Sequence, residues 1–223
     1  MNWKNILLTS VLIATTLYNC KPHTELKISN NTGKKTFISQ EEGEQDLQIL
    51  AQYKNKEDAW IYFDGMWADI GTNITNNSVS KSNSTILNAI PEDVLSSITI
   101  HEYHTHPGNE FINNTPPGPS DYKSLAENKK FLRAQRNVNV VGNVVTATGV
   151  WTYDLTRHLT YKLTSPQEQL QKKVSSQLSE QTFYLAGRVF TNPDLNKEEQ
   201  IQSFIDSMKV EGVLMQYKPF EKN

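Results

Sequence analysis

The 223-residue sequence predicts a mixed α/β domain in which helices flank a central β-sheet. Stretches rich in β-branched and aromatic residues alternate along the chain with stretches in which apolar residues recur at helical spacing. These stretches follow one another as helix, strands, helix, strands and helices. A chain of this length can also bury one core of ordinary size, so a single domain with an additional tail accounts for it.

The first twenty residues have the pattern of a targeting segment. Lys4 supplies a basic start, and residues 6–18 form a mostly apolar run that is short for a bilayer span. Cys20, the only cysteine, follows with Leu17 three residues before it, which resembles a bacterial lipoprotein signal. Cys20 is therefore the predicted lipidation site, and the lipid would anchor an exported protein to a membrane of the cell envelope. The alternative is an ordinary secretory signal or an uncleaved anchor, in which Cys20 has no role.

The remainder of the chain divides into a tether and a folded part. Residues 21–46 contain many Asn, Glu, Gly and Lys residues and few large apolar ones, so a flexible tether is predicted there. Residues 47–223 are assigned to the domain, which begins with a short helix. The formal net charge of -2 and the lack of a basic patch with interleaved aromatic residues exclude nucleic acid as a partner.

Two strands are predicted near the start of the domain. The first covers residues 60–63, and the Asp-Gly pair at 64–65 is a turn signal that leads to the second, near residues 66–70. Residues 71–84 are rich in Asn and Ser and are predicted to be a loop. Residues 86–95 are ambiguous, because a proline interrupts their helical pattern.

The middle of the domain is predicted to hold a helix and more strands. Apolar residues recur at helical spacing from Asp121 to Gln135, and Ser120 is a suitable N-cap for that helix. Residues 138–145 and 150–155 are rich in β-forming side chains and are predicted strands. Residues 159–163 are a candidate for a further strand.

Two helices and a strand are predicted at the end of the chain. Ser165 and Asn196 each begin a capping-box pattern at the start of a helix. Gly212 ends the second helix before a strand over residues 213–217. The apolar stripe of that helix is assigned to the core.

Only residues 98–121 have side chains that suggest a reaction. His104 and His106 are two positions apart in a strand pattern, so they share one face and can point at one ion. Asp121 is the first acid after the following loop that could reach the same point. Two imidazoles and a carboxylate leave a fourth position open to water, which is typical of a catalytic zinc site. The alternatives are a solvated strand face for the histidines and a helix-capping role for Ser120 with Asp121.

The HTHP sequence at residues 104–107, followed by a loop that contains Ser120 and Asp121, resembles the JAMM/MPN metalloprotease motif. The resemblance extends over about residues 55–155, because the first predicted strand and the hairpin over residues 143–154 also resemble that family. It implies a fold of the cytidine-deaminase-like type and a Zn²⁺ ion bound by the two histidines and the aspartate.

The resemblance also implies roles for two further residues. Glu57 matches the family's general base by its place before the first strand, with the adjacent Asp58 as the second choice. Ser120 matches the serine that stabilises the tetrahedral oxyanion. These two are the predicted catalytic residues, beside the predicted metal ligands His104, His106 and Asp121.

One departure from the family pattern concerns the third ligand. The family spaces serine and aspartate as S-x-x-D, whereas here Asp121 directly follows Ser120 and Lys123 stands where the aspartate would fall. Either Asp121 reaches the metal from a shifted start of the helix, or the third ligand is gone. Glu102 shares the strand face of the histidines, and it is a candidate for orienting an imidazole or for replacing the aspartate.

The resemblance therefore implies a zinc-dependent hydrolase that cleaves a peptide or isopeptide-like amide bond at the cell envelope. Its peptide or protein substrate is not identified by the sequence. Two alternatives stay open: a metal-free MPN-like lipoprotein used for binding or scaffolding, and a secreted toxin or effector domain.

Overall fold

A computed structural model of the chain describes residues 35–53, 57–71, 83–91, 98–106, 115–136 and 138–221. The strands are β1 (Lys35–Phe37), β2 (Ala59–Phe63), β3 (Met66–Asp69), β4 (Thr99–Thr105), β5 (Asn139–Val145), β6 (Gly149–Leu155) and β7 (Val213–Pro219). The helices are α2 (Gln40–Tyr53), α3 (Asn83–Ala89), α4 (Pro119–Arg136), α5 (Arg157–Leu163), α6 (Glu168–Phe190) and α7 (Lys197–Val210). Among the described residues, none of these helices is both long enough and apolar enough to span a bilayer.

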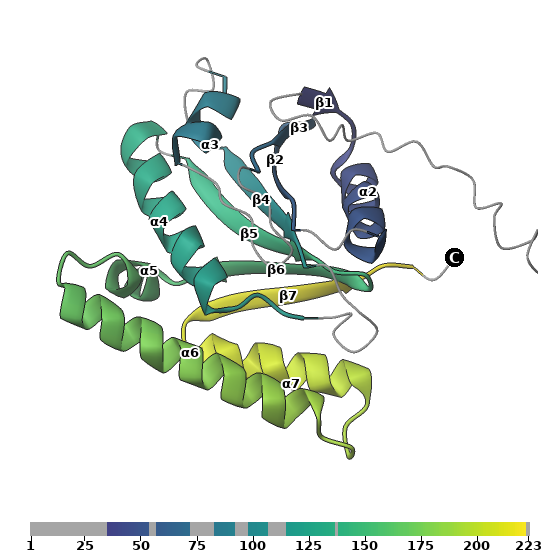
Figure 1. Cartoon of the computed structure of the whole chain (residues 1–223), viewed down its shortest axis with the longest axis vertical. Helices are drawn as coiled ribbons and strands as arrows, with labels where there is room; N and C mark the ends of the chain where they lie inside the picture. The colour runs from purple at the N-terminus through teal and green to yellow at the C-terminus, as the bar shows by residue number, and fades with distance from the viewer. Residues whose placement is uncertain are drawn as a thin grey trace, which may run out of the picture.

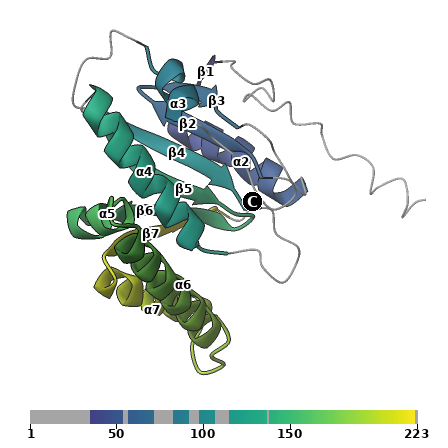
Figure 2. The same cartoon turned by 60° about the vertical axis from the view of Figure 1, so that its left-hand side comes forward.

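The strands form one mixed sheet with helices on both faces (Figure 1), which confirms the predicted mixed α/β class. The described strands lie in the order β1-β3-β2-β4-β5-β6-β7, and among the paired neighbours only β4 and β5 are parallel. The chain leaves β4, passes through α4 on one face and returns as β5. Figure 2 shows α4 on one side of the sheet and α2 on the other.

The two sheet faces carry separate hydrophobic cores. The larger core lies under α4, α6 and α7, and it includes the fully buried Tyr122, Trp151 and Phe204. The smaller core lies under α2, where Trp60 and Trp67 are buried. All three of the tryptophans that the structure describes therefore lie in a core.

The N-terminal helix corrects one prediction. The flexible tether predicted for residues 21–46 is wrong over residues 35–46, which form β1 and the first half of α2. The face of α2 that meets the sheet is held by contacts that a count of apolar residues does not detect. The buried Glu44 accepts a hydrogen bond of 2.7 Å from the Tyr103 hydroxyl, and a Cβ added at Gly43 would lie 2.1 Å from the Trp67 ring. Residues 1–34, with the predicted signal segment and Cys20, lie outside the described residues.

Two local predictions after β6 are also wrong. Residues 159–163 belong to helix α5 and are not a strand, because the Thr156 side chain caps the helix by accepting from the Leu159 N–H group at 3.3 Å. Helix α6 begins at Glu168, three residues beyond the predicted cap at Ser165. The Ser165 hydroxyl instead accepts a hydrogen bond from Gln167 N–H within the turn that precedes α6.

Other local predictions are confirmed. Asp64 and Gly65 have φ angles of +47° and +75°, as a tight turn between two strands requires. Asn196 caps α7 in a reciprocal capping box with Glu199. Gly212 ends α7 with a φ of +90° and leads directly into β7. Helix α3 occupies residues 83–89, within the region that the sequence leaves divided between loop and an ambiguous pattern.

Candidate metal centre

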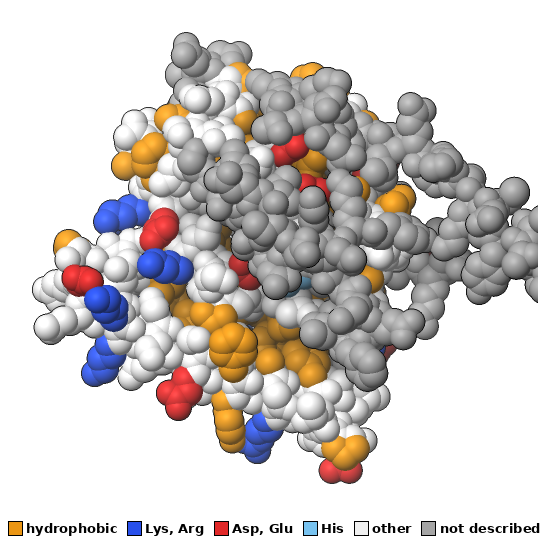
Figure 3. Space-filling model, in the orientation of Figure 1, with side chains coloured by type: hydrophobic (Ala, Val, Ile, Leu, Met, Phe, Trp, Pro, Cys, Tyr) orange, Lys and Arg blue, Asp and Glu red, His pale blue; other side chains and the backbone are white. Residues whose placement is uncertain are grey.

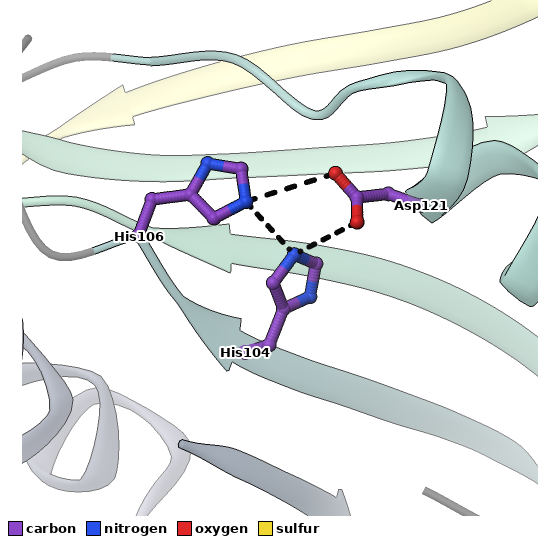
Figure 4. A group of neighbouring side chains, drawn as sticks. All are labelled: His104, His106 and Asp121. Atoms are coloured by element: carbon purple, nitrogen blue, oxygen red, sulfur yellow. Dashed lines mark hydrogen bonds and ion pairs between the residues drawn. The ribbon is translucent and has the colours of Figure 1, made fainter. Parts of the chain in front are cut away.

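The three predicted metal ligands meet at the carboxyl end of β4. His104 lies near the end of that strand, His106 directly follows it, and Asp121 lies in the first turn of α4. Because β4 and β5 are parallel and α4 connects them, the end of β4 and the start of α4 lie at the same edge of the sheet. Figure 4 shows the two imidazole rings and the carboxylate facing one another.

The ligand atoms are close together. The Nε2 atoms of His104 and His106 are 3.2 Å apart, and His104 Nε2 is 3.3 Å from Asp121 Oδ1. His106 Nε2 is 3.7 Å from Asp121 Oδ2. One donor atom from each residue lies within 4.8 Å of the other two. Among the described residues, these three form the group of side chains that could hold a metal ion, and it is called the metal-compatible group below.

These distances fit a tetrahedral ion. Zinc bound to nitrogen and oxygen at about 2.0–2.1 Å, with tetrahedral angles, holds its ligand atoms about 3.3 Å apart. The separations of 3.2 and 3.3 Å agree with that edge length, and the separation of 3.7 Å between His106 Nε2 and Asp121 Oδ2 is about 0.4 Å longer. Two imidazole nitrogens and one carboxylate oxygen are also a known donor set of catalytic zinc, with the fourth position left for water. The residues therefore fit a zinc ion, and the donor set is also compatible with other divalent transition metals.

A backbone carbonyl orients the second histidine. His106 Nδ1 lies 3.3 Å from the carbonyl oxygen of Thr115, so Nδ1 carries the proton when this hydrogen bond forms. Nε2 of that ring then has a free lone pair directed at the other ligands. This is the usual arrangement by which a group outside the ligand set fixes the tautomer of a metal-binding histidine.

The charges at the site favour forms that bind a metal. Burial lowers the pKa of His106, and the neighbouring His104 ring lowers it further. The carboxylates of Asp121 and Glu57 and the Thr115 carbonyl oppose this shift but do not reverse it. Burial would raise the pKa of Asp121, yet the two imidazoles and the Gly118 N–H group hold it well below its usual range. Near neutral pH, His106 is therefore neutral and Asp121 ionised, as metal ligands must be.

The position of Asp121 follows from where α4 begins. The helix starts at Pro119, and the carbonyl of Gly118 accepts the backbone bond from Tyr122, so the predicted N-cap role of Ser120 is wrong. Ser120 is instead the second residue of the helix, with an exposed side chain. The Gly118 N–H group donates to Asp121 Oδ2 at 2.7 Å, and this fixes the carboxylate beside the histidines.

Asp121, and not the residue at position 123, is the acid that lies beside the two histidines. Asp121 reaches the histidines from the first turn of α4, which corresponds to the shifted helix start. Lys123 instead pairs with Glu127, at 3.9 Å from its ammonium group, and nearly half of its side chain is exposed.

Glu57 lies just before β2, next to the end of β4. Its carboxylate is near enough to His106 to act on the pKa of that ring, and its side chain is partly exposed. The backbone here is held by two hydrogen bonds between Asp58 and Thr105, at 3.0 Å between Thr105 N–H and Asp58 carbonyl and at 2.9 Å between Asp58 N–H and Thr105 Oγ1. The structure thus places Glu57 within electrostatic range of His106.

Two other residues of β4 have different surroundings. Glu102 shares the strand face of His104 but accepts a hydrogen bond of 2.7 Å from Asn128 on α4, and it does not belong to the metal-compatible group. His101 faces the opposite side, as the strand alternation predicts, with its ring 6.4 Å from that of Tyr103. Sequence reasoning missed the contribution of Thr115, because a backbone carbonyl leaves no signal in the residue type.

The assignment of the site therefore rests on the motif residues and on their geometry. His104, His106 and Asp121 are brought together, Glu57 is near them, and Ser120 precedes the third ligand on the first turn of α4. Comparison of the chain with protein-family models, with curated proteins and with solved structures finds no match.

Proposed function

We propose that the protein is a zinc-dependent hydrolase of the JAMM/MPN type, which cleaves a peptide or isopeptide-like amide bond. The observation that carries this proposal is the convergence of the His104, His106 and Asp121 donor atoms, with two of their three separations at the edge length of a tetrahedral site and the third at 3.7 Å. The cytidine-deaminase-like fold of that family is part of the proposal, and the parallel β4-α4-β5 unit supports it.

Each residue of the site has a separate role in this reaction. Zinc, when bound, would lower the pKa of a water molecule to about 7 and polarise the substrate carbonyl. Glu57 would accept the proton from that water and pass it to the leaving amine. The exposed Ser120 hydroxyl would donate a hydrogen bond to the oxyanion that forms during attack. His106, fixed by the Thr115 carbonyl, would keep the ligand geometry during the reaction.

The metal content of purified protein tests the proposal. Residues 21–223, prepared without a metal-binding tag, are expected to hold about one zinc per chain in elemental analysis. His104→Ala and Asp121→Ala should lose the ion, because each removes one of three ligands. Lys123→Ala is the matched control. Lys123 lies two residues after Asp121 on α4, but it is exposed and pairs with Glu127. A parent protein that binds no zinc when supplied with it, or an Asp121→Ala variant that keeps its zinc, would overturn the assignment.

The cell envelope is the proposed location. The apolar run before Cys20 and the place of Leu17 support a lipoprotein signal, with the lipid as the link to the membrane. Cells that express the full chain with a labelled fatty acid should yield labelled protein, and Cys20→Ser should abolish the label. An unlabelled parent chain would leave export by an ordinary secretory signal as the better interpretation.

A further inference from the structure

A pocket lies at the C-terminal end of α4. It has a volume of about 730 Å³ and is lined by the C-terminal half of α4, by α5, and by residues at the start of β5 and the end of β6. Arg133, which lines it, follows Asp121 by twelve positions, and this corresponds to about 18 Å along the helix axis. The pocket is therefore separate from the metal centre, and both include residues of α4.

The charged residues of this pocket all have one sign. Four of the twelve described residues that line it are basic and none is acidic; the four are Lys129, Lys130, Arg133 and Arg157. Two of them are held by the protein itself. Lys129 pairs with the carboxylate of Asp154, and Lys130 donates to the carbonyl of Thr164 at 3.0 Å.

The two arginines are available to a ligand. Both side chains are exposed, and within the part of the chain that the structure describes neither takes part in an ion pair or a side-chain hydrogen bond. A guanidinium group presents a planar fork of N–H donors that matches a carboxylate or phosphate group. Arg133 from α4 and Arg157 from α5 therefore present unused oxyanion-binding groups to the same pocket.

The remainder of the pocket is largely apolar. Val138 and Leu155 are buried residues of its wall, and Ala134 and Pro166 add further apolar surface. The Tyr161 ring also lines it and is 65% exposed, which leaves an aromatic surface open to a ligand. Pockets of several hundred Å³ with apolar walls and a few polar groups are typical of small-molecule sites.

We propose that this pocket binds a small amphipathic anion, which has an apolar chain or ring and one carboxylate or phosphate head group. The head group lies between Arg133 and Arg157, and the apolar part covers Val138, Leu155 and Tyr161. Figure 3 shows basic side chains interspersed with acidic ones on the side of the molecule where α4 and α5 lie. A long polyanion would meet those acidic groups as well, so a small ligand fits this surface better.

Four amphiphiles with the same dodecyl chain test the head group. Laurate, dodecyl phosphate, dodecyl maltoside and dodecyltrimethylammonium are titrated below their critical micelle concentrations into residues 21–223, which contain every described residue, and binding is followed by calorimetry. At least one of the two anions is expected to bind at one site per chain. Its affinity should be at least about 10-fold higher than that of the neutral and cationic amphiphiles. The stronger of the two anions identifies the head group as carboxylate or phosphate.

Variants test the position of the site. Combined Arg133→Gln and Arg157→Gln substitutions are expected to weaken anion binding about 10-fold or more, whereas Arg188→Gln, at an exposed arginine on α6, should leave it unchanged. Ala134→Trp should also abolish binding, because it fills the pocket without changing its charge. Circular dichroism confirms that each variant is folded, which is expected because all four positions are exposed.

Three results would overturn the proposal: no binding of either anion, equal binding of dodecyl maltoside, or unchanged affinity in the double arginine variant or in Ala134→Trp. The titrations are repeated with a chelator and with His104→Ala. Anion binding is expected to be the same in both, because the pocket lies far from the metal ligands along α4. The result is thus independent of whether the proposed zinc hydrolase activity is correct.

Discussion

Replacing Glu57 by glutamine is expected to leave zinc bound while lowering the rate of amide hydrolysis by about 100- to 10,000-fold. Glutamine has nearly the same shape as glutamate but cannot accept the proton of the attacking water. Glu57 is not one of the three metal-compatible residues, so metal affinity should change little. The reaction is measured as zinc-dependent release of new amino groups from unfolded proteins and from lysine-linked isopeptides, with zinc determined on the same samples.

Asp58→Asn is the matched control for that experiment. Asp58 is the neighbouring acid, but it is buried, and its backbone pairs with Thr105. We expect Asp58→Asn to retain hydrolysis within a few-fold of the parent. If Glu57→Gln stayed active and Asp58→Asn lost activity, the general base would be Asp58 and the assignment to Glu57 would be wrong.

Phe204→Ala is expected to lower the free energy of unfolding by about 3–5 kcal/mol. Phe204 is fully buried, with its ring centroid 6.0 Å from that of Trp151 and 5.3 Å from that of Phe190. Removal of the ring leaves a cavity between α7, α6 and the sheet, and the surrounding side chains can fill only part of it. Urea denaturation followed by tryptophan fluorescence measures the loss, since Trp151 lies beside the substituted position.

Val210→Ala provides the reference on the same helix. Val210 is 85% exposed, so its truncation should change the free energy of unfolding by no more than about 0.5 kcal/mol. A loss for Phe204→Ala as small as that of Val210→Ala would mean that α7 does not contribute to the core described above.

Much of the fold can be predicted from local patterns, where one or two residues determine a conformation. The turn at Asp64 and Gly65 and the cap at Asn196 are examples, because each depends on nearby backbone geometry. Helix α5 could not be predicted in this way. It has only two buried apolar residues, Leu159 and Leu163, and Thr residues around them that also suit a strand.

The tether prediction fails over residues 35–46 for a different reason. α2 is held to the sheet by a buried hydrogen bond from Tyr103 to Glu44 and by close contact of Gly43 with Trp67. Both partners lie far along the chain from α2. A sequence that is low in apolar residues therefore indicates a solvated segment even when tertiary contacts make it part of the fold.

The candidate metal centre, like the fold, could be predicted in part from local patterns. Alternation along a strand correctly places His104 and His106 on one side, and the first acid after the loop is the third member of the group. The sequence could not decide whether Asp121 or the position of Lys123 faces the histidines. That depends on the residue at which α4 begins, and hence on how the preceding loop ends, which residue types alone do not fix.

The pairing of Thr105 with Asp58 links the two histidines mechanically to Glu57. Thr105 lies between the two histidines and binds the backbone that carries Glu57, through its own N–H group and through its hydroxyl. The strand end that carries the two histidines and the backbone that carries Glu57 are thus joined by two hydrogen bonds. A change that tilts β4 against the rest of the sheet would therefore move the histidines and Glu57 together, so this pairing couples their positions.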